Sequence, residues 1–172
     1  RVAFDFMDGG AGPEDALLRN AEALRRLRMV PRVLVDTGAR SPAQTLFGKT
    51  HALPIGAAPI GLANLVWPGT DVAVARAAAK HGLPYVLSSS GSTAIETIVA
   101  HAPEAWFQLY VGRDAAIVAD LIDRAEAAGC PVLVVTVDIP APGKRVRDLR
   151  NGFTLPLRPS WRGVLDLASH PA

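Results

Sequence analysis

Residues Glu104–Asp114 read EAWFQLYVGRD, and the central part of this stretch has the composition of a buried β-strand. Side chains alternate between the two faces of a strand. One face of Ala105–Val111 is apolar, whereas the other carries the amide of Gln108 and the phenol of Tyr110. Buried polar groups need hydrogen-bonding partners. The polar face is therefore expected to point toward a site, and the apolar face toward covering helices.

Three more apolar runs, each bounded by Gly or Pro, have the length of short strands: Leu53–Ile60, Leu83–Ser89 and Cys130–Asp138. Helical patterns alternate with these runs. They begin at Pro13, after Thr70, at Thr93 with Glu96 in capping-box spacing, and at the N-cap Asp114. Strands this apolar, alternating with helices, predict a parallel sheet covered by helices in an α/β fold.

The polar residues of the runs distinguish a barrel from an open doubly wound sheet. Each run becomes polar only toward its C-terminal end, with Ser88 on the second run and Thr136 on the fourth, besides Gln108 and Tyr110 on the third. Barrel enzymes build their sites at this end of the strands. The pattern favours a (β/α)8 TIM barrel, of which this chain holds the N-terminal segment and the first four βα units.

The composition excludes several classes of protein. The 172 residues are 49% hydrophobic with a net charge of +2, which predicts a globular domain and gives no indication of nucleic-acid binding. The lone cysteine, Cys130, rules out an internal disulfide and is expected to be structural in a reducing compartment. No apolar run reaches the ~18 residues of a membrane helix.

Several chemical motifs have simpler interpretations. GGAG at Gly9–Gly12 follows no strand and is expected to be a turn before a helix. SSSGS at Ser88–Ser92 lacks the nucleophile-elbow pattern. The histidines have no metal-ligand spacing and are not expected to be catalytic; they are His51, His81, His101 and His170.

Two loops are more informative. GKRVRDLRNGF at Gly143–Phe153 is a basic run, and one of its arginines is expected to bind an anion, although the spacing does not say which. In AAPIGLANLVWPG, Gly61 and Ala63 allow a flat ligand to approach the backbone. Such a ring would accept hydrogen bonds at its edge from Gln108, Thr136 and Ser88. This arrangement is what an isoalloxazine ring needs.

The chain resembles the N-terminal half of the FMN-dependent α-hydroxy acid oxidases and dehydrogenases, which include glycolate oxidase, L-lactate dehydrogenase and (S)-mandelate dehydrogenase. The resemblance rests on motifs in family order: FDFMDGGA, LFGKTHALPIGAAPIGLANLVWPGTDVAVARAAAKHGLPYVLSS, WFQLYV and VTVDIPAPGKRVRDLRNGF. It implies FMN as cofactor and oxidation of an L-2-hydroxy acid, mandelate-like or lactate-like, to the 2-oxo acid. Electrons would pass to a carrier or to oxygen. By resemblance, glycine at position 61 favours a dehydrogenase that passes them to a carrier.

The resemblance also implies residue roles. The backbone at Ala58, Pro59, Ile60 and Gly61 would lie along the flavin, and Ser88, Gln108 and Thr136 would hydrogen-bond to it. Tyr110 would orient the substrate hydroxyl, and Arg145 would assist substrate binding. Phe6 stands where most members have a tyrosine that holds the substrate carboxylate, which puts the substrate class in question.

The family's general-base histidine, a second substrate arginine and the phosphate-binding loops belong to a C-terminal half outside these residues. Residues 1–172 are therefore expected to be half of one barrel domain, ending in the mobile loop after the fourth strand. That loop, entered at PSWRGVLDLASHPA, carries a lipid-binding insertion in membrane-associated members. The resemblance thus allows a cytoplasmic homotetramer with peripheral membrane association at the inner face.

Two alternatives stay open from the sequence. One is a different phosphate-ligand barrel, such as an isomerase or a nucleotide dehydrogenase, with the same polar strand ends. The other is a flavin-binding barrel without catalysis, for which Phe6 is the only hint.

Overall fold

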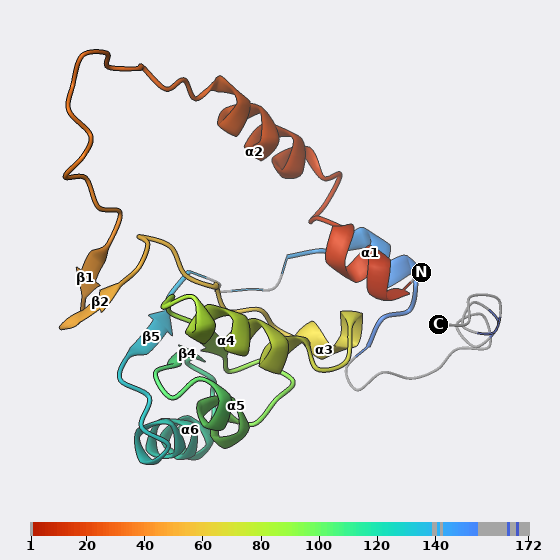
Figure 1. Cartoon of the computed structure of the whole chain (residues 1–172). Coiled ribbons are helices and arrows are strands. Elements are labelled where there is room, and N and C mark those ends of the chain that lie inside the picture. The colour runs from red at the N-terminus through yellow and green to blue at the C-terminus, as the bar shows by residue number, and fades with distance from the viewer. Residues whose placement is uncertain (1, 139–140, 142, 155–164, 166–167, 169–172) are drawn as a thin grey trace. The chain divides into compact units, whose positions relative to one another are not determined.

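A computed structural model describes residues 2–138, 141, 143–154, 165 and 168, and its contacts divide the chain into two compact units. The larger unit comprises residues 36–140. It contains a parallel three-stranded sheet in the spatial order β3 (Val86–Ser88), β4 (Trp106–Tyr110) and β5 (Leu133–Thr136) (Figure 1). The parallel sheet of an α/β fold predicted from the apolar runs is confirmed for these three strands.

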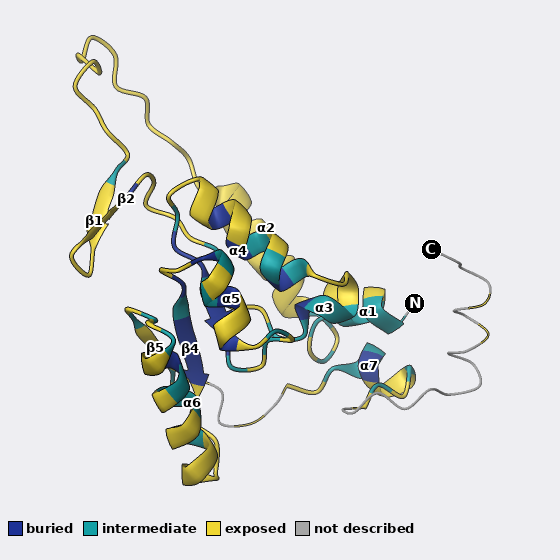
Figure 2. Ribbon diagram, turned by 60° about the horizontal axis from the view of Figure 1, so that its bottom comes forward, coloured by how far each residue is buried: buried dark blue, intermediate teal, exposed yellow. Residues whose placement is uncertain are grey.

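Three helices accompany the sheet: α4 (Thr70–Lys80), α5 (Ile95–His101) and α6 (Ala115–Ala127). Neighbouring helices contact one another, α4 with α5 and α5 with α6. The core between helices and sheet is apolar and includes Ala75, Leu87, Ile98, Phe107 and Leu109, each at most 2% exposed. Most of β4 is accordingly buried (Figure 2).

The first predicted strand, Leu53–Ile60, is not a strand in the structure. It makes one parallel bridge, Ala57 to Tyr85, in which the Ala57 N–H donates to the Pro84 carbonyl at 2.9 Å. Pro54 and Pro59 have no N–H to donate to a ladder, and this explains why pairing does not extend. The segment still lies beside β3, on the side away from β4.

The helix boundaries test the capping predictions. Asp114 caps α6, since its carboxylate accepts from the Ala116 and Ile117 N–H groups at 2.9 and 3.4 Å. The predicted capping box at Thr93 is wrong, because α5 has Ala94 as its N-cap and the Thr93 hydroxyl instead accepts from Asn64.

A hairpin that the sequence patterns did not predict precedes the sheet. Strands β1 (Gln44–Leu46) and β2 (Lys49–His51) pair antiparallel around Phe47 and Gly48, whose φ values of 50° and 80° suit a type I′ turn. The Phe47 ring packs edge-on against Trp106 at 5.4 Å. A short helix, α3 (Ala63–Val66), follows the bridge segment.

The smaller unit comprises residues 1–35 and 141–172, and only its described residues are considered below. It contains α1 (Val2–Asp8), α2 (Asp15–Arg26) and α7 (Val146–Arg150). Part of the run predicted as a basic loop is thus helical, and α7 packs on α1. Arg147 pairs with Asp8 at 2.5 Å and with Glu14 at 2.6 Å.

Among the described residues no helix is long and apolar enough to cross a bilayer. The predicted loop entry, residues 159–172, lies outside the described residues except for Leu165 and Ala168.

Candidate functional site

The structure joins Ser88, Gln108 and Thr136 in one chain of hydrogen bonds across the three strands. The Ser88 hydroxyl donates to Gln108 Oε1 at 3.1 Å, and Gln108 Nε2 donates to Thr136 Oγ1 at 2.7 Å. Ser88 and Gln108 are 5% and 1% exposed. The parallel register brings them together, since Ser88 pairs directly with Gln108. Gln108 pairs with Val134 on β5, and Thr136 lies two residues beyond Val134 on the same face of the sheet.

Backbone N–H groups also bond to these side chains, and counting them shows which hydrogen-bonding groups of Gln108 and Thr136 are still unused. Gln108 Oε1 also accepts from the Ser89 N–H at 3.3 Å, and Ser88 Oγ accepts from the Ser90 N–H at 3.1 Å. A glutamine amide has two N–H donors and a threonine hydroxyl has one. Among the residues that the structure describes, the second Gln108 N–H and the Thr136 O–H therefore remain without an acceptor.

Tyr110 ends β4 next to this chain. Its backbone N–H donates to Ser89 Oγ at 3.1 Å, while its side chain is 41% exposed. Within the described part of the chain, nothing hydrogen-bonds the Tyr110 hydroxyl. The phenol is thus available to a ligand.

The segment Ala58–Gly61 follows the bridge at Ala57 and is open to solvent, with Ile60 57% exposed. It is held from one side, because the Leu62 N–H donates to the Ser90 carbonyl at 3.0 Å. A Cβ at Gly61 would lie 3.3 Å from Ser90 Cβ, so a side chain there would press on the serine turn. Ala63 is 5% exposed and lines a small cavity together with Ala57, Ala58 and Ile60.

A buried acid that sequence reasoning missed fixes the turn after β3. Asp71 is 2% exposed, and its carboxylate accepts from the Ser92 N–H at 3.0 Å. Asn64 accepts from the Asp71 N–H at 3.3 Å and donates to Thr93 at 3.2 Å. Burial, and then the charge of Asp71, raise the pKa of Tyr85 to about 12. In the sequence, Asp71 has only the signature of an acid in the first turn of a helix.

Arg145 and Phe6 lie together in the smaller unit. Arg145 Nε donates to Asp148 at 2.5 Å, and another N–H of its guanidinium donates to the Phe6 carbonyl. The guanidinium carbon lies 5.1 Å from the centre of the Phe6 ring, which stacks on Phe153 at 5.0 Å. Arginine has five N–H donors, so several remain for an anion. The Phe6 ring thus lies between the Arg145 guanidinium and the Phe153 ring as a stacking partner.

Other reactive groups do not assemble into a site in the part of the chain that the structure describes. No three potential metal ligands gather there. Burial, and then the charge of Glu96, raise the pKa of Cys130, which disfavours the reactive thiolate. His170 lies outside the described residues.

Comparisons with known proteins identify the family of the chain. The family model for FMN-dependent dehydrogenases matches residues 1–172. A 4-hydroxymandelate oxidase of Amycolatopsis orientalis is 44% identical over 153 residues, covering 89% of this chain and 43% of that protein. An L-lactate dehydrogenase of Caulobacter vibrioides is 39% identical over 183 residues, covering 99% and 48%.

Solved structures give the same result. A mandelate oxidase with (S)-4-hydroxymandelic acid superposes with a TM-score of 0.85 at 42% identity, covering 93% of this chain and 44% of that one. A variant mandelate oxidase with a C4a-OH-FMN adduct has a TM-score of 0.84 at 39% identity, covering 99% and 55%. The chain spans about half the length of the relatives that it matches.

Proposed function

The chain belongs to the family of FMN-dependent dehydrogenases, and from this premise we propose that its protein oxidises an L-2-hydroxy acid to the 2-oxo acid. The observation that carries the proposal is the Ser88–Gln108–Thr136 chain, beside which Tyr110 ends β4 with its backbone N–H bonded to Ser89. These groups fit the polar edge of a flavin on one side and a substrate hydroxyl on the other. When bound, FMN supplies the acceptor for an electron pair.

The proposed architecture is a (β/α)8 barrel. Its support is the consecutive order of the bridge segment at Ala57 and strands β3, β4 and β5, all parallel, with a buried hydroxyl–amide chain at their C-terminal ends. We propose that residues 1–172 contribute the first four βα units and that the rest of the barrel supplies the general base. The exposed Leu133 and Val135 of β5, at 43% and 47%, fit a strand that further units cover.

The proposed roles follow the chemistry of each group. Ser88, Gln108 and Thr136 hold the flavin edge, and the Ala58, Pro59, Ile60 and Gly61 backbone lies along its ring. Tyr110 orients the reacting hydroxyl by a hydrogen bond. Arg145 balances negative charge on the substrate. Asp148 and Phe6 hold the Arg145 guanidinium in place.

The proposed substrates are mandelate-like or lactate-like acids, because named relatives are a 4-hydroxymandelate oxidase and an L-lactate dehydrogenase. Electrons pass to a carrier or to oxygen. We also propose that the protein is a cytoplasmic homotetramer and that the loop after β5 associates with the membrane surface. Its test is sedimentation of the full-length protein with and without anionic vesicles.

The central experiment is a visible spectrum of the full-length protein. We expect a yellow protein whose flavin absorbance bleaches anaerobically on addition of (S)-mandelate or L-lactate. A colourless holoprotein would support a different phosphate-ligand barrel, and a yellow protein that no 2-hydroxy acid bleaches would support a flavin-binding barrel without catalysis. Oxygen uptake, compared with reduction of an artificial electron acceptor, then separates an oxidase from a dehydrogenase.

Phe6→Tyr tests the role proposed for position 6. The ring keeps its stacking under Arg145, and the added hydroxyl gains a hydrogen bond to the substrate carboxylate. One such bond to a charged group is worth about 1.5 kcal/mol, so KM should fall about tenfold while kcat stays within a few-fold. The control is Phe4→Tyr on the same helix, where the side chain is 58% exposed and KM should not change. An unchanged KM in Phe6→Tyr would show that the ring does not face the substrate.

A further inference from the structure

The serine turn, residues 88–92, leads from β3 toward α5. The backbone N–H groups of residues 89–91 donate to acceptors within the turn or on β4, at 2.8 to 3.1 Å. The Ser92 N–H donates instead to the carboxylate of Asp71 on α4, at 3.0 Å. The conformation of the turn therefore depends on a side chain from another element.

Asp71 is an unusual acid for its place in a helix. An acid in a first helical turn gains from the helix dipole but does not need to be buried for that. Asp71 is 2% exposed, and none of the described basic side chains forms an ion pair with it. Taking a carboxylate out of water without a cationic partner is costly. The group that this buried carboxylate reaches is the Ser92 N–H, 21 residues along the chain.

Asn64 on α3 is a second anchor between the same elements. Its Oδ1 accepts from the Asp71 N–H at 3.3 Å. Its Nδ2 donates to the hydroxyl of Thr93, directly after the turn, at 3.2 Å. One amide thus joins the start of α4 to the end of the serine turn.

The serine turn connects two groups that are proposed to contact FMN. The segment 58–61 is tied to it by the Leu62 N–H, which donates to the Ser90 carbonyl at 3.0 Å. The Ser90 N–H donates in turn to Ser88 Oγ at 3.1 Å, and the Ser88 hydroxyl donates to Gln108 Oε1. A change in the turn would therefore move the ring-side backbone and the hydroxyl at the ring edge together.

We propose that Asp71 is a positioning residue for the flavin site, with Asn64 as its partner. Its carboxylate holds the Ser92 N–H, and the serine turn then presents Ser88 and the segment 58–61 to the cofactor. Asp71 acts through the turn and not on FMN itself. This inference rests on the proposed function, because the groups that Asp71 positions are those proposed to bind the flavin.

The test compares Asp71→Ala with Asp71→Asn in the full-length protein. Alanine removes the acceptor, whereas asparagine keeps an oxygen for the Ser92 N–H without the charge. The Kd of the apoprotein for FMN should rise at least about tenfold in Asp71→Ala and stay within about threefold of the wild type in Asp71→Asn. Fluorescence titration with FMN measures both values. The visible circular dichroism of the bound flavin should change in Asp71→Ala and be restored in Asp71→Asn.

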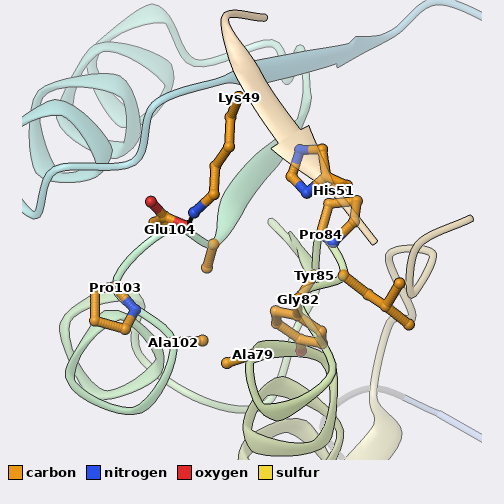
Figure 3. A pocket seen from close by; sticks show the side chains of 11 residues that line it. Lys49, His51, Ala79, Gly82, Pro84, Tyr85, Ala102, Pro103 and Glu104 are labelled. Carbon is orange, nitrogen blue, oxygen red and sulfur yellow. Dashed lines mark ion pairs between the residues drawn. The ribbon is translucent and has the colours of Figure 1, made fainter. Parts of the chain in front are cut away.

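Two controls separate positioning from stability and from charge. The Asp114 carboxylate also accepts backbone N–H groups, so Asp114→Ala should lower the urea midpoint but leave the Kd for FMN and the flavin dichroism unchanged. The other control lies at the N-terminal ends of β3 and β4, on the wall of a cavity of about 320 Å³ (Figure 3). Glu104 pairs there with Lys49, and Glu104→Gln should remove this acid without changing the Kd for FMN.

Asn64→Ala keeps the result independent of the folding of Asp71→Ala. It leaves the carboxylate in place but removes the second anchor, and it should raise the Kd for FMN at least about threefold. The inference is overturned if Asp71→Ala binds FMN as tightly as the wild type or, where that variant does not fold, if Asn64→Ala does. It is also overturned if Asp114→Ala weakens FMN binding equally, or if Asp71→Asn restores nothing. A wild-type protein that binds no FMN would overturn the proposed function, and this inference with it.

Discussion

Gln108→Leu should lower the free energy of unfolding of the full-length apoprotein by about 2–5 kcal/mol, and it should weaken FMN binding by about tenfold to a hundredfold. The side chain is 1% exposed and bridges two hydroxyls on neighbouring strands. Leucine fills similar volume but leaves Ser88 and Thr136 without their amide partner. Each buried unsatisfied group costs about 1–3 kcal/mol. Urea denaturation and fluorescence titration of apoprotein with FMN measure the two effects.

A double-mutant cycle separates the hydrogen-bond chain from simple loss of packing. If the cost comes from an orphaned Ser88 hydroxyl, then Ser88→Ala in the Gln108→Leu background should cost less than it does in the wild type. We expect a coupling of about 1–2 kcal/mol. Additive effects of the two substitutions would mean that the Ser88–Gln108 bond carries no stability. Ser41→Ala, at an exposed residue distant in sequence, is the matched control for serine removal.

The polar face of β4 was predictable because strand geometry leaves so few choices. Once Ala105–Val111 is a strand, alternation places Gln108 on the face opposite Phe107 and Leu109. The polar ends of adjacent parallel strands then meet at one edge, as Ser88 on β3 and Thr136 on β5 each do with Gln108 on β4. The prediction of a strand at Leu53–Ile60 was wrong. The apolar composition of this run is typical of a strand, but its prolines limit pairing to one bridge at Ala57.

Contacts between segments that are distant in the sequence could not be predicted, because the residues around each partner show no distinctive pattern. Arg145 was one of four basic residues in its run, and only its packing against Phe6 and Asp148 distinguishes it in the structure. Asp71 resembled an ordinary acid in a first helical turn, yet it is buried under the Ser92 turn. His51 ends a hairpin strand that no alternation pattern marked, because each of its two strands has only three residues.

Tyr110→Phe should lower kcat/KM for the 2-hydroxy acid by about tenfold to a hundredfold, the value of one hydrogen bond to a group that gains charge in the transition state. Stability and flavin content should not change, because the phenol is 41% exposed and no described residue hydrogen-bonds its hydroxyl. This combination distinguishes Tyr110 from Gln108, whose loss should affect folding and FMN together.

The matched control is Tyr85→Phe, which removes the chain's other phenol hydroxyl from a buried position near Asp71. That variant should keep kcat/KM within a few-fold, since the Tyr85 side chain is 6% exposed and belongs to the core. Steady-state kinetics with (S)-mandelate and L-lactate, together with the flavin spectrum and urea midpoint of each variant, give all the readouts. Equal activity of Tyr110→Phe and wild type would exclude a substrate contact for the Tyr110 hydroxyl. A loss of flavin in that variant would place the hydroxyl at the cofactor instead, because a group that touches only substrate cannot change FMN affinity in the absence of substrate.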